Sequence, residues 1–220
     1  MKLVLASGSQ RRRELLTMCG YDYEIIVSNA DETIDENDPE SFVRALSFRK
    51  AKEVFDRLFA AGRRDFAVIG SDTVVAFQKE GEAKPVIIGK PKDAKDAVRI
   101  LSMLSGKTHR VFTGVSVIAD IPDENAAAQC SIQEKAEIQT ECSITEVTFE
   151  TLSPDEIADY VNSGDPLDKA GSYGIQGPFG MFVREIRGNY FTVIGMPIPV
   201  LYKMLKKIGI LPHGFYERIE

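Results

Sequence analysis

Short apolar segments that alternate with helical stretches constrain the fold of this chain most strongly. Residues Lys2–Ala6 have the pattern of a short buried strand, which breaks at Ser7–Ser9 into a helical stretch that ends at Gly20. Because strand and helix patterns alternate over most of the length, the sequence predicts the α/β class with a mixed sheet. Further strands are expected at 23–27, 66–69, 74–77, 86–88 and near 111–117, and further helices after Asp38, Asp93, Ser153 and Pro197.

Two later segments carry turn signals. Gly70–Thr73 separates two apolar runs and is expected to interrupt a strand, which would place a carboxylate at the point of interruption. Gly188–Asn189 lies between Met181–Ile186 and Tyr190–Ile194, and this arrangement predicts a hairpin.

The length and the apolar content favour one domain. A chain of 220 residues with 44% hydrophobic residues can bury a sizeable core, and neither an internal repeat nor a flexible linker divides it. We therefore expect a single domain over 1–220, with an exposed insertion at about 121–135. The apolar runs fall short of the roughly 20 residues that a membrane helix needs. The N-terminal apolar stretch is also too short for a secretory signal, so we expect a cytoplasmic protein without a membrane partner.

The charge balance narrows the range of ligands. Lys and Arg total 27 against 33 Asp and Glu, for a net charge of −6, which argues against general binding to nucleic-acid backbones. A small phosphorylated ligand remains compatible with this charge if the basic residues are concentrated locally. The three cysteines show no metal-binding spacing and are typical of a reducing compartment.

The first candidate site is the turn that contains Ser7, Arg11 and Arg12. A strand that ends in small residues and leads directly into a helix exposes backbone N–H groups, and arginines in the first helical turn add bidentate donors for phosphate oxygens. The alternative is a solvated arginine cluster. Cations at a helix start oppose the helix dipole, however, and such an arrangement usually requires an anion.

Three further segments could carry chemistry, each with a plainer alternative. Asp72 could bind Mg²⁺ or accept a proton from water, or it could simply form a turn. Lys90, between Gly89 and Pro91, could direct a point charge at a phosphate or be an ordinary surface lysine. The glycine-rich segment 168–177 could approach a ligand closely and present Gln176 to a base edge, or it could be a structural loop.

Taken together and in order, seven segments resemble the Maf family of nucleoside triphosphate pyrophosphatases, over about Lys2 to Leu205. They are Leu5–Leu16, Asp31–Glu32, Arg49–Ala51, Gly70–Val75, Gly89–Pro91, Thr113–Val115 and Asp168–Gly177. One residue departs from the family pattern, because Gln10 stands where proline is usual. Glutamine can also adopt the first helical position, so we expect a modest loss of rigidity there rather than a loss of activity.

The resemblance implies a fold and a reaction. The fold would be similar to that of the inosine triphosphatases, with a long mixed sheet and flanking helices that form two lobes around a deep central cleft, in a homodimer. The reaction would convert a nucleoside triphosphate and water to the monophosphate and pyrophosphate, with a divalent metal cation such as Mg²⁺, Mn²⁺ or Co²⁺. Asp72 would be the general base or a metal ligand, and Glu32 its metal partner. The residues expected to contact the triphosphate are Ser7, Arg11, Arg12, Lys50 and Lys90.

Substrate choice follows from finer similarity. Ser71–Thr73 and Tyr173–Gly177 resemble the branch that acts on dTTP, UTP and modified pyrimidine nucleotides, with Thr73 and Gln176 as candidate base or substrate contacts. The branch that prefers 7-methyl-GTP is expected to carry a tryptophan in the arginine motif, and this chain contains none. The alternatives are that branch, a nucleotide-binding regulator of septum formation or cell division with slow turnover, and an interaction domain that has lost the site. His109 and His213 are interpreted as structural or solvent-exposed.

Overall fold

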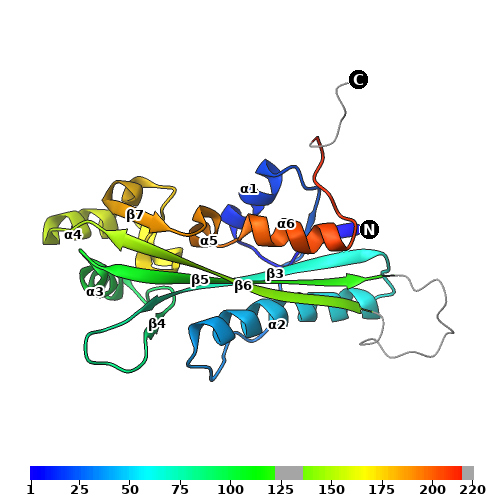
Figure 1. The fold of residues 1–220 in the computed structure, drawn as a ribbon, viewed down its shortest axis with the longest axis horizontal. Helices are drawn as coiled ribbons and strands as arrows, with labels where there is room; N and C mark the ends of the chain where they lie inside the picture. Colours follow the sequence, from blue (N-terminus) through cyan, green and yellow to red (C-terminus); the bar gives the residue numbers. More distant parts are fainter. Residues whose placement is uncertain (122–135, 215–220) are drawn as a thin grey trace.

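The computed structural model describes residues 1–121 and 136–214, which form a seven-stranded mixed sheet flanked by helices (Figure 1). The strand order is β2-β1-β3-β5-β6-β7, and β4 pairs separately with β3. The strands are β1 (Lys2–Leu5), β2 (Glu24–Ile25), β3 (Phe66–Phe77), β4 (Val86–Ile88), β5 (Thr108–Asp120), β6 (Ala136–Phe149) and β7 (Val183–Arg187). The expected α/β class is therefore confirmed. The expected insertion at about 121–135 lies, apart from Ile121, outside the described residues.

Helices cover both faces of the sheet (Figure 1). The long helix α2 (Pro39–Ala60) packs on one face, against β3 and β5. Helices α1 (Gln10–Met18), α5 (Tyr190–Ile194) and α6 (Ile198–Lys207) lie on the opposite face. Helices α3 (Ala94–Leu104) and α4 (Pro154–Asn162) contact each other at one end of the sheet. Short 3₁₀ segments η2 (Asp165–Asp168), η3 (Ala170–Ser172) and η4 (Pro178–Phe182) follow α4.

This two-sided cover explains why β3 and β5 are buried at almost every position. On the α2 face, side chains such as Val68 and Ile118 pack against Val54 and Phe55. On the opposite face, the strands pack against α1 and α6. A strand buried on both faces needs apolar side chains at successive positions, so it has no two-residue alternation.

Two glycines allow α2 to approach the centre of the sheet closely. A Cβ on Gly70 would overlap the carbonyl oxygen of Ser47, and a Cβ on Gly114 would overlap that of Val43. Gly70 and Gly114 lie on the adjacent strands β3 and β5, which pair in antiparallel register. The helix backbone therefore rests on the sheet where side chains are missing, and this fixes how far α2 stands from Asp72.

Two strands, β1 and β4, pair with different parts of the same edge of β3, and the gap between them leaves the middle of β3 open on that edge. β5 pairs with β3 along one edge, from Ala67 to Ala76. On the other edge, β1 pairs in parallel with residues 66–69 and β4 pairs in antiparallel with residues 75–77. Among the described residues, 70–74 therefore have no strand partner on that edge. Ligands of open α/β sheets bind where strands diverge in this way.

The predicted helix starts are confirmed, and three of them have a side-chain cap. Asp38 and Asp93 each accept a hydrogen bond from the backbone of the first helical turn. Ser153 and Glu156 form a reciprocal capping box at α4. Gln10 occupies the first position of α1, and its side chain donates to Glu14 Oε1 at 2.8 Å, so glutamine does adopt the place that proline would take.

Two local expectations are wrong. Gly70–Thr73 does not interrupt a strand, because β3 runs unbroken through it while β5 supplies the ladder along the other edge. Tyr190–Ile194 is helix α5 rather than a hairpin strand, because the Asn189 side chain accepts from the N–H groups of Phe191 and Thr192 and so caps a helix. Within the described residues, no helix is long and apolar enough to cross a membrane.

The contact between Gly114 and α2 is testable. We expect Gly114→Ala to lower the free energy of unfolding by about 2–3 kcal/mol, because the new methyl group must push α2 from the sheet. Urea unfolding of the purified protein measures this. Gly89→Ala is the control, since a Cβ there meets nothing within 4 Å. Equal stability of Gly114→Ala and the wild type would contradict the close approach.

Candidate active site

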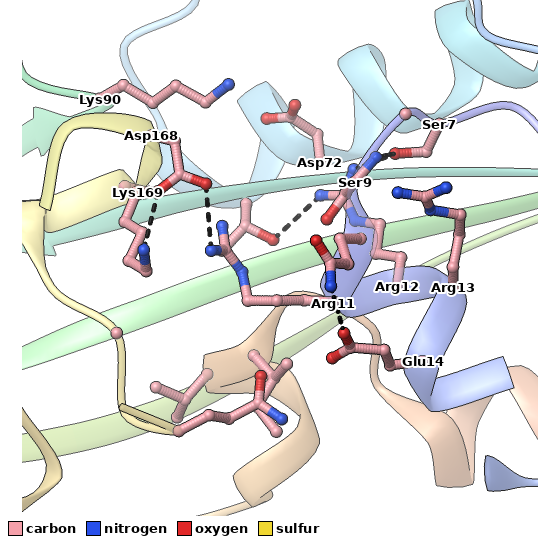
Figure 2. A pocket seen from close by; sticks show the side chains of 18 of the residues that line it. Ser7, Ser9, Arg11, Arg12, Arg13, Glu14, Asp72, Lys90, Asp168 and Lys169 are labelled. Atoms are coloured by element: carbon pink, nitrogen blue, oxygen red, sulfur yellow. Dashed lines mark hydrogen bonds and ion pairs between the residues drawn. The ribbon is translucent and has the colours of Figure 1, made fainter. Parts of the chain in front are cut away.

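A cleft of about 1000 Å³ opens beside the unpaired stretch of β3 (Figure 2). Its walls come from the β1–α1 turn, α1, β3, α5 and the segment 165–177, which follows α4. These segments are far apart in the sequence, and the sheet topology brings them together. The cleft contains every residue for which the sequence predicts a role: Ser7, Arg11, Arg12, Glu32, Lys50, Asp72, Thr73, Lys90 and Gln176.

The start of α1 forms one wall and is suited to an anion. No described side chain caps the first turn of this helix, and that turn contains no acidic residue. Ser7 Oγ accepts hydrogen bonds from the Ser9 N–H at 3.2 Å and from Arg12 Nη1 at 3.1 Å. The hydroxyl proton of Ser7 is therefore left to donate toward a ligand. Open N–H groups, the helix dipole and two arginines together favour a bound phosphate group.

The centre of the cleft holds a lysine between two carboxylates. Lys50 Nζ, from α2, lies 2.7 Å from Asp72 Oδ1 and 2.9 Å from Glu32 Oε1. The side chains of Lys50 and Asp72 are only 11% and 12% exposed, whereas that of Glu32 is 67% exposed. The pair of Lys50 and Asp72 is therefore shielded from solvent, which strengthens its attraction relative to a surface ion pair. Glu32 forms the outer, hydrated side of the group.

Arg12 connects the α1 wall to the sheet. Its Nε donates to the carbonyl of Gly195 at 2.9 Å, and its Nη2 donates to Thr73 Oγ1 at 3.4 Å. Thr73 Oγ1 also lies 3.0 Å from Thr113 Oγ1 on β5. Burial lowers the pKa of Arg12, and the nearby Asp72 carboxylate acts in the opposite direction. These bonds hold the guanidinium in a fixed plane beside the cleft.

A second arginine reaches across the cleft. Arg11 Nη1 lies 3.3 Å from Asp168 Oδ2, and Figure 2 shows the side chain extending from α1 toward that carboxylate. Lys169 Nζ lies 2.8 Å from Asp168 Oδ1 on the same carboxylate. Burial acts to raise the pKa of Asp168, but its hydrogen bonds and attraction to Lys169 and Arg11 outweigh this and lower it. Asp168 is therefore ionised. Its carboxylate oxygen pairs with the Arg11 guanidinium in the way that a phosphate oxygen could.

Lys90 and Gln176 complete the cleft from its outer rim. Both side chains are exposed. Lys90 forms no ion pair with any residue that the structure describes, and it extends over the cleft beside Asp72 (Figure 2). It also lines a neighbouring cavity of about 720 Å³, next to β4. Its ammonium group is therefore available to an incoming anion.

The carboxylates offer part of a metal site. Among residues 1–121 and 136–214, no group of three or more His, Cys, Asp and Glu side chains converges as a metal site. Glu32 and Asp72 nevertheless place two oxygens around one cation, the ammonium of Lys50. Mg²⁺ is commonly held by one or two carboxylates together with substrate phosphates and water. The donor set fits such an ion when the substrate supplies the remaining ligands.

A comparison with family models matches residues 2–208 to the family described as Maf-like protein. The chain belongs to the Maf family. A relative from Agathobacter rectalis named dTTP/UTP pyrophosphatase is 39% identical over 217 residues, which cover 95% of this chain and 98% of that protein. A relative of the same name from Bacillus thuringiensis is 42% identical, over 95% and 96% of the two chains.

A comparison with solved structures also returns a match. The Ham1 protein of Staphylococcus aureus is matched with a TM-score of 0.48 and 14% sequence identity, over 94% of this chain and 100% of that chain.

The Maf motifs explain most of the cleft, but sequence analysis missed part of it. Every residue with a predicted role lines one cavity, while its role in binding or catalysis stays a prediction. The contribution of Asp168, Lys169 and Asp165 was missed, although the first two lie within a Maf motif. The sequence does contain one indication of this group: Asp165 and Lys169 are four residues apart, and they form an ion pair at 2.9 Å. Their relation to Arg11, 157 positions from Asp168, appears only in the fold.

His109 is buried next to Tyr173, which lines the cleft, so it is structural rather than a ligand contact. Its ring packs edge-on against Phe149 and Tyr173, and its Nε2 lies 3.0 Å from the Tyr173 hydroxyl. Burial lowers the pKa of His109 from 6.5 to about 3. His213, by contrast, is exposed and lies 2.8 Å from Asp22.

The pKa of His109 predicts acid sensitivity. Below pH 6.5 the unfolded chain binds a proton at His109 that the folded protein excludes, so stability falls as the pH falls toward 3. At pH 5 this amounts to about 2 kcal/mol. Urea unfolding at pH 7.5 and pH 5.0 should show a smaller loss for His109→Gln than for the wild type. An identical pH dependence in both proteins would exclude this contribution.

Proposed function

We propose that this protein hydrolyses nucleoside triphosphates to the monophosphate and pyrophosphate, with a preference for dTTP and UTP. One observation carries the proposal. The open start of α1, two arginines and the group formed by Lys50, Asp72 and Glu32 face one cleft. The proposal is supported by relatives named dTTP/UTP pyrophosphatase, to which the chain is about 40% identical over nearly its full length.

The triphosphate binds along the α1 wall. Ser7 and the first-turn N–H groups donate to its oxygens, and Arg11, Arg12 and Lys90 neutralise its charge. To bind phosphate, Arg11 gives up its contact with Asp168, which keeps its second contact with Lys169. A protein with a net charge of −6 can hold this anion because its cations are concentrated locally.

Asp72 acts on the attacking water. Its carboxylate accepts a proton as the water oxygen bonds to the α-phosphorus, and the bond from that phosphorus to the bridging oxygen breaks to release pyrophosphate. Lys50 orients the Asp72 carboxylate through their 2.7 Å contact. Charge that develops on the phosphate oxygens is stabilised by the arginines and Lys90, which are already in place in the cleft.

Glu32 and Asp72 would hold a divalent cation such as Mg²⁺, Mn²⁺ or Co²⁺ together with phosphate oxygens. When bound, such an ion supplies charge neutralisation to the phosphates. In that state Lys50, which contacts the same two carboxylate oxygens, must share them or turn toward phosphate.

Base selection is assigned to the opposite side of the cleft. Gln176 is exposed there, with an amide that can both donate to and accept from a pyrimidine edge. Thr73 fixes Arg12 and faces the same cavity. Removal of non-standard pyrimidine nucleotides is the cellular role that such a selectivity suits.

We also propose that the protein works in the cytoplasm as a homodimer and binds neither nucleic acid nor membrane. The acidic composition supports the absence of a nucleic-acid partner. The Maf resemblance supports the dimer, and light scattering of the purified protein tests it. A molar mass equal to that of one chain would exclude the dimer.

A substrate panel tests the reaction. The protein is incubated with Mg²⁺ or Mn²⁺ and with dTTP, UTP, CTP, 7-methyl-GTP, ATP or GTP, and pyrophosphate and orthophosphate are measured separately. We expect pyrophosphate and the monophosphate from dTTP and UTP. Orthophosphate as the first product would mean that another bond is cut. A preference for 7-methyl-GTP would assign the other branch, and no turnover at all would favour a nucleotide-binding regulator.

Asp72→Asn tests the general base. Because asparagine cannot accept the proton, we expect turnover of dTTP to fall by about 10²- to 10⁴-fold. The fold and the binding of dTTP should be retained, as measured by circular dichroism and calorimetry. Asp22→Asn is the control, since its carboxylate is exposed and lies outside the described cleft walls. Turnover of Asp72→Asn at the wild-type rate would remove Asp72 from the mechanism.

A further inference from the structure

Tyr160 of α4 is buried, and its hydroxyl joins two parts of the segment that carries Gln176. The hydroxyl donates to Asp165 Oδ2 at 2.5 Å and accepts from the backbone N–H of Gly174 at 3.1 Å. The described residues that line the cleft include Asp165 and Gly174 but not Tyr160. Any effect of the Tyr160 hydroxyl on a ligand must therefore pass through its two hydrogen-bond partners.

Lys169 closes the same arrangement from the other side. Its ammonium group contacts the backbone oxygen of Asp165 at 2.5 Å, Asp165 Oδ1 at 2.9 Å and Asp168 Oδ1 at 2.8 Å. Its aliphatic stem lies against Gly174, where an added Cβ would come within 2.5 Å of Lys169 Cε. Gly174 is thus enclosed between the lysine stem and the tyrosine hydroxyl.

Gly174 is the first residue of the turn that presents Gln176. The Gly177 N–H donates to the Gly174 carbonyl at 3.2 Å, which closes a four-residue turn with Gln176 at its third position. Ile175, the second residue, is partly buried and packs against two of the apolar core clusters. A shift at Gly174 therefore changes the direction in which Gln176 projects.

The charges in this group favour one arrangement of its hydrogen bonds. Burial raises the pKa of Tyr160, so the hydroxyl remains a donor. Burial also acts to raise the pKa of Asp165, but the hydrogen bonds from Tyr160 and Lys169 prevail and lower it. At neutral pH the carboxylate therefore accepts from Tyr160, and the oxygen of Tyr160 remains free to accept from Gly174.

We propose that Tyr160 is a positioning residue for nucleobase recognition, which sets the turn bearing Gln176 through its hydrogen bond to Gly174. This assignment rests on the proposed function. It deepens that proposal, because it separates recognition of the base from recognition of the phosphates. The phosphate-binding groups on α1 have their own supports, among them the bond from Arg12 to Gly195.

Tyr160→Phe tests the proposal, since it removes the hydroxyl and keeps the buried ring. We expect KM for dTTP and UTP to rise about tenfold, the equivalent of one or two lost hydrogen bonds, with kcat within about twofold of the wild type. Inorganic tripolyphosphate, which has no base, should inhibit the variant and the wild type equally. A general loosening of the cleft would instead weaken inhibition by tripolyphosphate and raise KM together.

A second measurement is independent of catalysis. Hydrogen exchange followed by mass spectrometry should show faster exchange in the peptide that contains Gly174, because its N–H loses its acceptor. Tyr202→Phe, on α6 and outside the described cleft walls, is the matched control and should leave KM and this exchange unchanged.

The outcomes separate this inference from the function on which it rests. A raised KM with unchanged tripolyphosphate inhibition and faster exchange near Gly174 supports the positioning role. An unchanged KM, a parallel loss of tripolyphosphate inhibition, or unchanged exchange overturns it while leaving the proposed function intact. A wild-type protein that releases no pyrophosphate from any nucleotide would contradict the proposed function itself.

Discussion

The unpaired stretch of β3 between β1 and β4 is the constraint on which the rest of the site depends. Because β1 ends beside Ile69 and β4 ends beside Val75, the sheet opens at the point where Asp72 and Thr73 lie. Successive strand residues point to opposite faces, so Asp72 meets Lys50 of α2 while Thr73 meets Arg12 of α1. One short stretch of strand thereby connects the carboxylate group to the anion-binding wall.

The charges in this opening are paired in advance of any ligand. Lys50 is held by two carboxylates, and Arg11 is held by Asp168. Such pairs lower the cost of keeping like charges close together in a partly buried cleft. In the proposed complex, a triphosphate would exchange partners with groups already in place, which avoids ordering flexible side chains. Lys90, which has no ion-pair partner among the described residues, lines the cleft with its ammonium group open to an anion.

Much of this fold could be predicted from local signals, whereas contacts between segments distant in the sequence could not. Asp38 and Ser153 marked helix starts because a cap acts within a few residues. The continuity of β3 through Gly70 was hidden, because that glycine serves contact with a helix rather than a turn. The residues that the Maf motifs single out do line one cleft. The hydrogen bond from the Gly174 N–H to the Tyr160 hydroxyl, however, depends on how the segment after α4 folds back against that helix. The spacing of residues in the sequence does not indicate that this segment folds back.

In the proposed mechanism Asp72 directs a water molecule at the α-phosphorus, and one measurement tests this directly. Hydrolysis of dTTP in ¹⁸O-labelled water, followed by mass spectrometry of both products, shows which phosphorus is attacked. Attack on the α-phosphorus by water that Asp72 deprotonates predicts that the label enters dTMP and leaves pyrophosphate unlabelled. Label in pyrophosphate would place the attack on the β-phosphorus and contradict the account.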